Sequence, residues 1–441
     1  MTARTFFPAL LTVLMVITGL PLSRGHAATI TIVPGDGAGE GFYDTRPPDP
    51  ASTAGGNAGA TLGEQRYNAF AHAASIWSSA LVSPVEIRIS AVMDPLPCTS
   101  RSAVLGAAGP QSVHADFAGT PNPQTWYPQA LANSLAGVDL SPEDDDIMAV
   151  FNSSIGTTCP FPYPWYYGLD AKPPKNTVDF VAIVLHELTH GLGFITLVDT
   201  DSGTKFAGLD DAFMQHLEDH STGLLYPLMT DAERAAANRN TGNLHWVGAS
   251  VVAMGGLLQD GRDPGGHVEM YAPNPPEPGS SVSHFSNELA PDELMEWRYT
   301  GSNHAPGLAA SLFADIGWEL NPVPSIRGNG VNSALTVGSG ALLNVAVSLE
   351  SGGQDGQPAD WWAAALTPEG WYWFTLDSGW IRSDEAISGY SGPLFKLASY
   401  TLFNGDLAPG QYTVYFGVDL IPNGVLDFDS LYYTPIAINI Q

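Results

Sequence analysis

Apolar and polar residues follow two different periods in the N-terminal part of the chain. After Glu64, apolar side chains recur at spacings of three and four residues up to Trp77, which predicts an amphipathic helix. Residues 85–89 alternate apolar and charged side chains, as a half-buried strand does. A second helical stretch over residues 126–135 leads to another predicted strand over residues 147–152. Helices and strands in this succession predict an α+β unit.

The segment that follows Asn176 is apolar on nearly every side. Asn176 or Thr177 is the expected cap of a helix, and an acidic residue in the first turn would be stabilised by the helix dipole. Gly191 and Gly193 are able to end this helix. Because apolar residues cover nearly its whole circumference, we expect the helix to be buried.

Turn-rich stretches divide the rest of the chain. Residues 29–62 are rich in Gly, Pro, Ala and Thr and show no sustained period, which predicts a loose lead-in. The predicted α+β domain covers residues 63–320. Within it, residues 194–283 contain a helical piece at residues 209–217 and many loops, which predicts an inserted subdomain.

The texture changes after Pro324. Alternating segments at residues 341–349, 371–376 and 411–418 are separated by Gly, Asn and Pro, which predicts a β-sandwich over residues 325–441. This domain also holds five closely spaced tryptophans: Trp361, Trp362, Trp371, Trp373 and Trp380. Packing in the sandwich core explains them, and so does a platform that stacks on carbohydrate or another surface.

The first 28 residues have the pattern of a signal peptide. Arg4 is followed by an almost entirely apolar run over residues 6–20 and by small residues at 25–28. The run is short for a bilayer span, and no later segment approaches about 20 uninterrupted apolar residues. The sequence therefore predicts a secreted protein, extracellular or periplasmic, without a transmembrane segment.

Charge narrows the classes of partner. Acidic residues outnumber basic ones 45 to 16, giving a formal net charge of −29, so a nucleic acid would be repelled. Ca²⁺ or a cationic substrate, here a protein or peptide, fits this balance better, and the alternative is that the acidic surplus only keeps an exported protein soluble. Two groups of oxygen-bearing side chains are candidate calcium ligands: Asp199 and Asp201, and further along the chain Asp419, Asn423, Asp427 and Asp429.

The chain has only two cysteines, Cys98 and Cys159. In an oxidising compartment an even number of cysteines predicts a disulfide, here a single one. The alternative is that Cys98 acts as an inhibitory thiolate on a metal ion.

His186-Glu187-Leu188-Thr189-His190 lies inside the predicted buried helix. In this pattern the two imidazoles lie one turn apart on one helix face, close enough to hold one Zn²⁺, and the glutamate reaches the metal-bound water. A bound metal also explains polar side chains in a buried helix, where unpaired groups cost several kcal/mol. The motif predicts His186 and His190 as zinc ligands and Glu187 as the general base.

A catalytic zinc needs a third protein ligand. The compact metzincin spacing would place it at residue 196, which is a threonine and a poor ligand. Further on, Ser283-His284-Phe285 is followed by Asp292-Glu293-Leu294-Met295, and this combination resembles the leishmanolysin family. The resemblance covers residues 176–318 and implies a metzincin-like fold with a long insertion, His284 as the third ligand and Met295 in a methionine turn beneath the zinc.

Several other side chains are candidates for function. Alternative candidates for the third ligand are four carboxylates: Asp199, Asp210, Asp211 and Glu218. Tyr299 is a candidate stabiliser of the oxyanion, as is His304, with ordinary packing as the alternative. His216 and His220 are one helical turn apart, and either bind a second metal or lie on a solvated helix face.

These features predict a secreted zinc metalloendopeptidase in which Glu187 activates the attacking water. The strand at residues 147–152 is the predicted edge strand that pairs with an extended substrate. The competing prediction is a secreted binding or adhesion protein, with a zincin-like domain as scaffold and the aromatic sandwich as contact surface. Glu187 separates the two, since a scaffold needs no general base.

Overall fold

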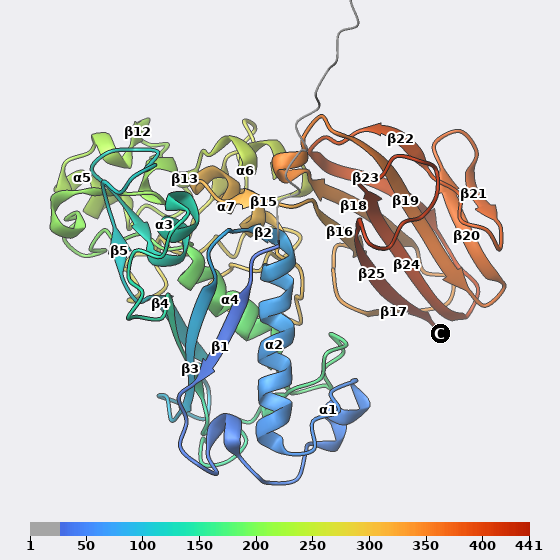
Figure 1. Ribbon diagram of the computed structural model, residues 1–441, viewed down its shortest axis with the longest axis horizontal. Helices are drawn as coiled ribbons and strands as arrows, with labels where there is room; N and C mark the ends of the chain where they lie inside the picture. Colours follow the sequence, from blue (N-terminus) through green and yellow to red (C-terminus); the bar gives the residue numbers. More distant parts are fainter. Residues whose placement is uncertain (1–26) are drawn as a thin grey trace, which may run out of the picture.

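A four-stranded sheet in the order β1-β3-β7-β4 organises the N-terminal unit of the computed structural model, which describes residues 27–441 (Figure 1). β1 (Ile30–Pro34), β3 (Ile87–Asp94) and β7 (Ile147–Asn152) are parallel. β4 (Gly106–Pro110) pairs antiparallel with β7 and forms one edge. Side chains of β3 are alternately buried and more exposed, as the period-two pattern predicts.

Two expectations about this sheet are wrong. The predicted edge strand, β7, lies between β3 and β4, so the free edge beside it belongs to β4. Residues 29–62 are not a loose lead-in, because they supply β1 and two short helices, η1 (Gly41–Tyr43) and α1 (Pro50–Ala54). Most of the predicted signal peptide, residues 1–26, lies outside the described residues.

Two long helices pack against each other and carry the middle of the unit. Thr61 is the N-cap of α2 (Leu62–Ala80). Trp77 in α2 donates a hydrogen bond of 3.3 Å to the carbonyl of Leu185 in α4 (Phe180–Leu192). α4 is buried along nearly its whole length, as predicted. Among the described residues, no helix combines the length and apolar character needed to cross a bilayer.

Further short elements complete this unit. The predicted helix over residues 126–135 is divided into β6 (Thr125–Pro128) and α3 (Gln129–Ala136). α7 (Leu308–Ile316) is followed directly by β15 (Glu319–Leu320). β15 pairs antiparallel with β2 (Leu81–Val82), which follows the end of α2. The remaining strands here are β5 (Val113–His114), β8 (Trp165–Tyr166) and β9 (Val178–Asp179).

The insertion has its own small sheet. Its strand order is β12-β11-β13-β14, with β11 (Leu217–Asp219), β12 (Leu224–Leu225), β13 (Leu244–Trp246) and β14 (Val268–Glu269), all antiparallel to their neighbours. Residues 209–217 are not the predicted helix but β10 (Asp210–Asp211) and a single 3₁₀ turn, η3 (Met214–His216). The helical elements are η2 (Phe206–Gly208), η4 (Tyr226–Leu228), α5 (Asp231–Ala237), α6 (Ala249–Met254) and η5 (Gly255–Leu257).

The C-terminal region is β-rich and consists of two sheets (Figure 1). One has three strands, β16 (Val323–Gly328), β18 (Leu343–Glu350) and β23 (Leu397–Gly405). The other holds β17 (Leu335–Val337), β19 (Pro358–Thr367), β20 (Gly370–Thr375), β21 (Gly379–Arg382), β22 (Tyr390–Pro393), β24 (Gly410–Asp419) and β25 (Leu431–Ile440). The 3₁₀ turn η6 (Gly352–Gln354) lies between β18 and β19.

Side chains of both sheets form one apolar cluster, to which Ile326 and Val345 contribute from one sheet and Phe416 and Ile438 from the other. The chain is thus a mixed α+β protein with a β-rich C-terminal region. Three of the five tryptophans are buried, which favours packing over an exposed platform. They are Trp361, Trp362 and Trp373.

Candidate metal centre

α4 fixes the first two histidines of the site. Asp179 is the N-cap, and its carboxylate accepts a 3.0 Å hydrogen bond from the N–H of Val181, so Asp179 rather than Asn176 or Thr177 starts the helix. The helix ends at Gly193, whose φ of 131° is strained for other residues. Gly191 is still helical, and the side chain of Ile147 in β7 lies against it, leaving no space for a Cβ atom.

Three histidines converge through their Nε2 atoms. Nε2 of His186 and Nε2 of His190 each lie 3.1 Å from Nε2 of His284. His284 comes from the far end of the insertion, so the fold brings together residues about one hundred positions apart. The three form a group whose potential ligand atoms are within 4.8 Å of one another.

The opposite ring nitrogens fix the orientation of these histidines. The Nδ1 atoms of His186, His190 and His284 each lie 2.8 Å from a backbone carbonyl oxygen, of Leu294, Phe194 and Ser280 respectively. A carbonyl only accepts, so each Nδ1 carries the proton and each Nε2 presents a lone pair. Three lone pairs directed at one point repel one another unless a cation lies between them, and this is the arrangement of histidines that bind zinc.

Burial keeps these imidazoles neutral. It lowers the pKa of His186 to about 4 and that of His190 to about 3. The pKa of His284 is held well below its usual range, first by burial and then by the two neighbouring histidines. Protons therefore do not compete with a metal for the three Nε2 atoms at neutral pH.

Glu187 lies between the histidines and the edge strand β4. Burial raises the pKa of its carboxyl to about 8, and a hydrogen bond from the backbone of Ala108 acts in the opposite direction. A Cβ atom added to Gly106 would lie 3.1 Å from Cγ of Glu187 and 2.8 Å from the ring of Phe151. Glycine at this position lets the backbone of β4 approach the glutamate closely.

The methionine segment is hydrogen-bonded to two of the histidine-bearing segments. Leu294 accepts from His186, and the carbonyl of the next residue, Met295, accepts a 2.8 Å hydrogen bond from the N–H of Phe285, beside His284. Met295 is fully buried. The segment therefore supports two of the three histidine-bearing segments through its backbone carbonyls.

The chain also passes close to the compact metzincin position. The N–H of Thr196 donates a 3.2 Å hydrogen bond to Oγ of Ser283, directly before His284. The two ends of the insertion therefore lie side by side, next to His284.

None of the carboxylates weighed as alternative ligands belongs to the groups of potential metal ligands found within residues 27–441. Asp211 accepts hydrogen bonds from Thr196, Leu197 and Met214 instead. Asp210 pairs with Lys205, whose Nζ lies 2.5 Å from its Oδ1. The carboxylate of Asp199 accepts a hydrogen bond from the N–H of Ser202 in the same loop, and Glu218 lies beside His220.

Tyr299 and His304 gather at the start of α4. The hydroxyl of Tyr299 accepts a 3.1 Å hydrogen bond from the N–H of Asp179, and Nε2 of His304 lies 2.9 Å from the Asp179 carboxylate, to which Ser302 also donates. At 1.5 Å per residue, the start of the helix is about 10 Å from His186. Both side chains contact the helix cap rather than the three Nε2 atoms.

The three histidines and Glu187 line a cavity of about 1300 Å³. Its walls come from β4, from one face of α4, from residues 278–284 and from residues 293–303. The backbone edge of β4 that does not pair with β7 borders this cavity. A volume of this order accommodates several residues of an extended peptide.

The remaining predicted features have these positions. Cys98 and Cys159 form the predicted disulfide, which leaves no thiolate for inhibition. The carboxylate of Asp199 accepts hydrogen bonds from the N–H groups of residues 201 and 202, and that of Asp419 from residues 421 and 427. Calcium at either place stays a prediction. His216 stacks on Trp246, away from His220.

Comparison with known proteins gives a match to a family model and similarity to solved structures. The model of a protein family described as SPBPB7E8-like matches residues 58–248, less than half of the chain. Among solved structures, the chain is similar to the CARDB domain of a Pyrococcus furiosus protein in complex with di-metal ions, at 17% identity, a TM-score of 0.18, and coverage of 27% of this chain and 88% of that chain. No curated protein matches the sequence.

Proposed function

We propose that this chain is a zinc-dependent endopeptidase with a metzincin-like catalytic domain, most similar in its site to the leishmanolysin family, and a C-terminal β-sandwich. The observation that carries the proposal is the convergence of three Nε2 lone pairs beside Glu187 in a large cavity. His186, His190 and His284 would hold the zinc. Three histidine ligands leave a fourth position for water, as in catalytic rather than structural zinc sites.

Zinc at this place would lower the pKa of a bound water towards about 7 and polarise a substrate carbonyl. Glu187 accepts the proton of the attacking water at its carboxylate and delivers it to the nitrogen of the departing amine. The positive charge of the metal favours the ionised carboxylate and thereby opposes the effect of burial on the pKa of Glu187.

The edge strand β4 is the proposed binding site for the substrate backbone. Its partner β7 occupies only one side, so an extended peptide would pair with the other and pass Glu187. The small side chains at residues 106–109, all Gly or Ala, allow a chain to lie close to the strand. We further propose that the protein acts outside the cytoplasm, which the signal-like N-terminus and the disulfide support.

The test compares casein hydrolysis and zinc content in wild type, Glu187→Gln and His284→Ala. Glu187→Gln should bind zinc as the wild type does and lose at least about 10²-fold in kcat, the usual contribution of general acid–base catalysis. His284→Ala should lose both zinc affinity and activity. Full zinc binding with no hydrolysis of any protein or peptide by the wild type would favour a scaffold instead.

A further inference from the structure

A second group of histidine and carboxylate side chains lies in the insertion. His220 directly follows β11, His267 directly precedes β14, and Asp263 lies in the turn before it. One potential ligand atom of each lies within 4.8 Å of those of the other two. This His220–Asp263–His267 cluster shares no residue with the proposed catalytic centre.

The atoms of the cluster approach one another without forming hydrogen bonds. Nδ1 of His267 is 3.1 Å from Oδ2 of Asp263, yet this buried nitrogen has no hydrogen-bond partner. Nδ1 of His220 lies 3.7 Å from the same oxygen. A buried polar atom without a partner costs about 1–3 kcal/mol, and a cation bound to all three side chains would satisfy them together.

Glu218 is placed to orient His220. Nε2 of His220 lies 3.5 Å from Oε1 of Glu218, whereas Nδ1 faces Asp263; this Nε2 is also buried and makes no hydrogen bond, so the carboxylate is near it without being bonded to it. A metal-bound histidine commonly turns its other nitrogen towards a carboxylate, which fixes the tautomer. With the proton on Nε2, the lone pair of Nδ1 faces Asp263. The ring also stacks on His245 in β13, with centroids 3.9 Å apart, so its plane is fixed.

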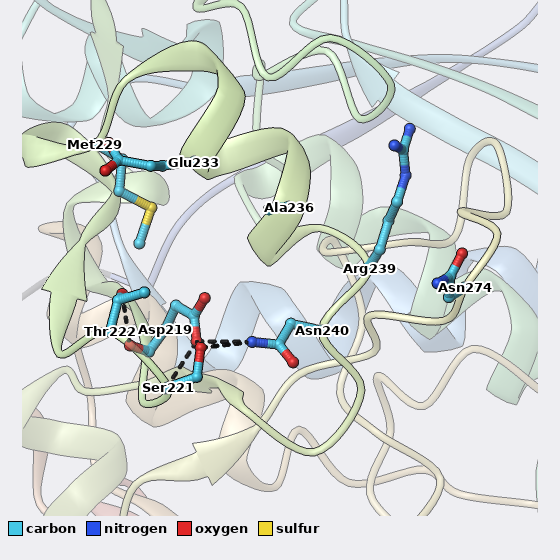
Figure 2. Close-up of a pocket in the computed structure, with 9 residues that line it drawn as sticks. All are labelled: Asp219, Ser221, Thr222, Met229, Glu233, Ala236, Arg239, Asn240 and Asn274. Carbon is cyan, nitrogen blue, oxygen red and sulfur yellow. Dashed lines mark hydrogen bonds between the residues drawn. The ribbon is translucent and has the colours of Figure 1, made fainter.

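The backbone on both sides of the cluster is fixed by hydrogen bonds. Figure 2 shows the side chain of Asp219, which accepts from the N–H of Ser221 and from Nδ2 of Asn240, each at 2.9 Å. These bonds flank His220, whose own N–H donates to the carbonyl of Asn243. The cavity drawn in Figure 2, of about 450 Å³, lies beside this turn.

The turn that carries Asp263 and His267 is equally ordered. Oδ1 of Asp263 accepts a 2.9 Å hydrogen bond from the N–H of His267. In return, the backbone N–H of Asp263 donates a 3.0 Å hydrogen bond to the carbonyl of His267. Only Oδ2 of Asp263 is left to face the two imidazoles. The three side chains are 20–32% exposed, so an ion can enter from solvent.

We propose that His220, Asp263 and His267 form a second metal site, for a zinc-type divalent cation with a structural role. Two imidazoles and one carboxylate suit Zn²⁺, whereas Ca²⁺ prefers a larger set of oxygen ligands. The ion would join the turn after β11 to the turn before β14 and so fix the edge of the insertion sheet.

The position of the cluster suggests what this fixation serves. β14 is hydrogen-bonded to the segment that carries His284, because the N–H of Ser286 donates to the carbonyl of Glu269 and the N–H of Tyr271 to that of His284, both at 2.9 Å. A cation at the cluster would therefore hold the strand against which the third histidine segment is built. The site does not depend on the proposed protease activity.

Zinc stoichiometry tests the proposal directly. After equilibrium dialysis against buffered Zn²⁺, bound zinc is measured by elemental analysis in the full chain. The wild type should hold two ions per chain and Asp263→Asn, which is nearly isosteric, should hold one. His220→Ala/His267→Ala should also hold one. The His186→Ala/His190→Ala chain should keep one ion, at the second site.

Either of two results would overturn the proposal. In the first, Asp263→Asn and His220→Ala/His267→Ala both bind as much zinc as the wild type; in the second, a folded His186→Ala/His190→Ala chain binds no zinc. His114→Ala is the matched control, since this histidine contacts Ser112 and Ser141 and belongs to neither cluster, and it should keep both ions. Far-UV circular dichroism checks that each variant is folded. If only the catalytic proposal fails, the wild type will bind two zinc ions and hydrolyse no protein or peptide.

Discussion

Arg327 and Glu293 form a buried ion pair that joins β16, the first C-terminal strand, to the candidate metal centre, with Nη2 of Arg327 2.5 Å from Oε1 of Glu293. The other carboxylate oxygen accepts from the N–H of Leu308 at the start of α7. The residue after Glu293 is Leu294, whose carbonyl orients His186. The C-terminal region therefore contributes to the support of the site and is not merely attached to it.

Replacement of Arg327 by methionine should destabilise the chain by about 3–5 kcal/mol, because a buried carboxylate would be left without its partner. Urea unfolding monitored by tryptophan fluorescence measures this. Arg88→Met is the matched control, since its pair with Asp145 is partly open to solvent, with side chains 43% and 23% exposed, and solvent-accessible pairs contribute about 0–1 kcal/mol. Arg327→Met/Glu293→Gln should recover part of the loss. Equal effects of Arg327→Met and Arg88→Met would contradict this role of the pair.

Gly106→Ala should lower kcat/KM through a local displacement of Glu187. The added Cβ would lie 2.8 Å from Phe151 and 3.1 Å from Glu187, so one of them must move, and misplacement of a catalytic group by about 1 Å costs as much as 10²-fold. Gly338→Ala, in the C-terminal region away from the cavity, meets nothing within 4 Å and should leave the rate unchanged. Peptide hydrolysis by both variants, with Tm measured in parallel, separates displacement from unfolding. Indistinguishable rates would argue against the placement of β4 beside Glu187.

Zinc should stabilise the fold through the three histidines. A ligand at 100 times its Kd adds about 2.7 kcal/mol to the folded state, which appears as a rise in Tm. The His220→Ala/His267→Ala chain isolates this effect from the proposed second site. In that background the rise should persist with Glu187→Gln and largely disappear with His284→Ala. An undiminished rise with His284→Ala would mean that His284 is not a ligand.

Local patterns were sufficient for the elements on which the site is built. The span of β7 matches its predicted range, and α2 and α4 follow from apolar spacings that packing reinforces. β4 was missed because Gly-Ala-Ala-Gly-Pro has neither alternation nor β-branched residues, so only its pairing with β7 makes it a strand. The helix predicted over residues 209–217 was wrong for a related reason. Asp211 is fixed by hydrogen bonds from residues 196, 197 and 214, which override helical propensity.

The candidate site shows the same division. His186, Glu187 and His190 could be found from their spacing, and His284 was found only through its family resemblance. The carbonyls that orient the rings could not be predicted, because Leu294, Phe194 and Ser280 act through their backbone. Nor could Asp263 be paired with His220, because no local period connects a turn after one strand with a turn before another.

The buried carboxyl of Asp146 should make stability depend on pH in the opposite sense to a carboxylate whose pKa is lowered by folding. Burial raises its pKa to about 6, although it accepts hydrogen bonds from Asn133 and from the N–H of Arg88. In the unfolded chain the group has its usual pKa near 4. Between these two values the folded chain binds the proton and the unfolded chain does not, so stability falls as pH rises from about 4 to about 6 and changes no further above that.

Asp146→Asn isolates this effect, since the amide resembles the protonated acid and does not titrate. The free energy of unfolding of the wild type minus that of Asp146→Asn should therefore decrease from pH 4 to pH 6 and then level off. The subtraction removes the contributions of the histidines, which titrate in both chains. Asp199→Asn is the control: hydrogen bonds from Ser202 lower the pKa of this exposed carboxylate, so the corresponding difference should rise with pH instead of falling. A difference for Asp146→Asn that rises with pH would show that Asp146 is stabilised as the carboxylate instead.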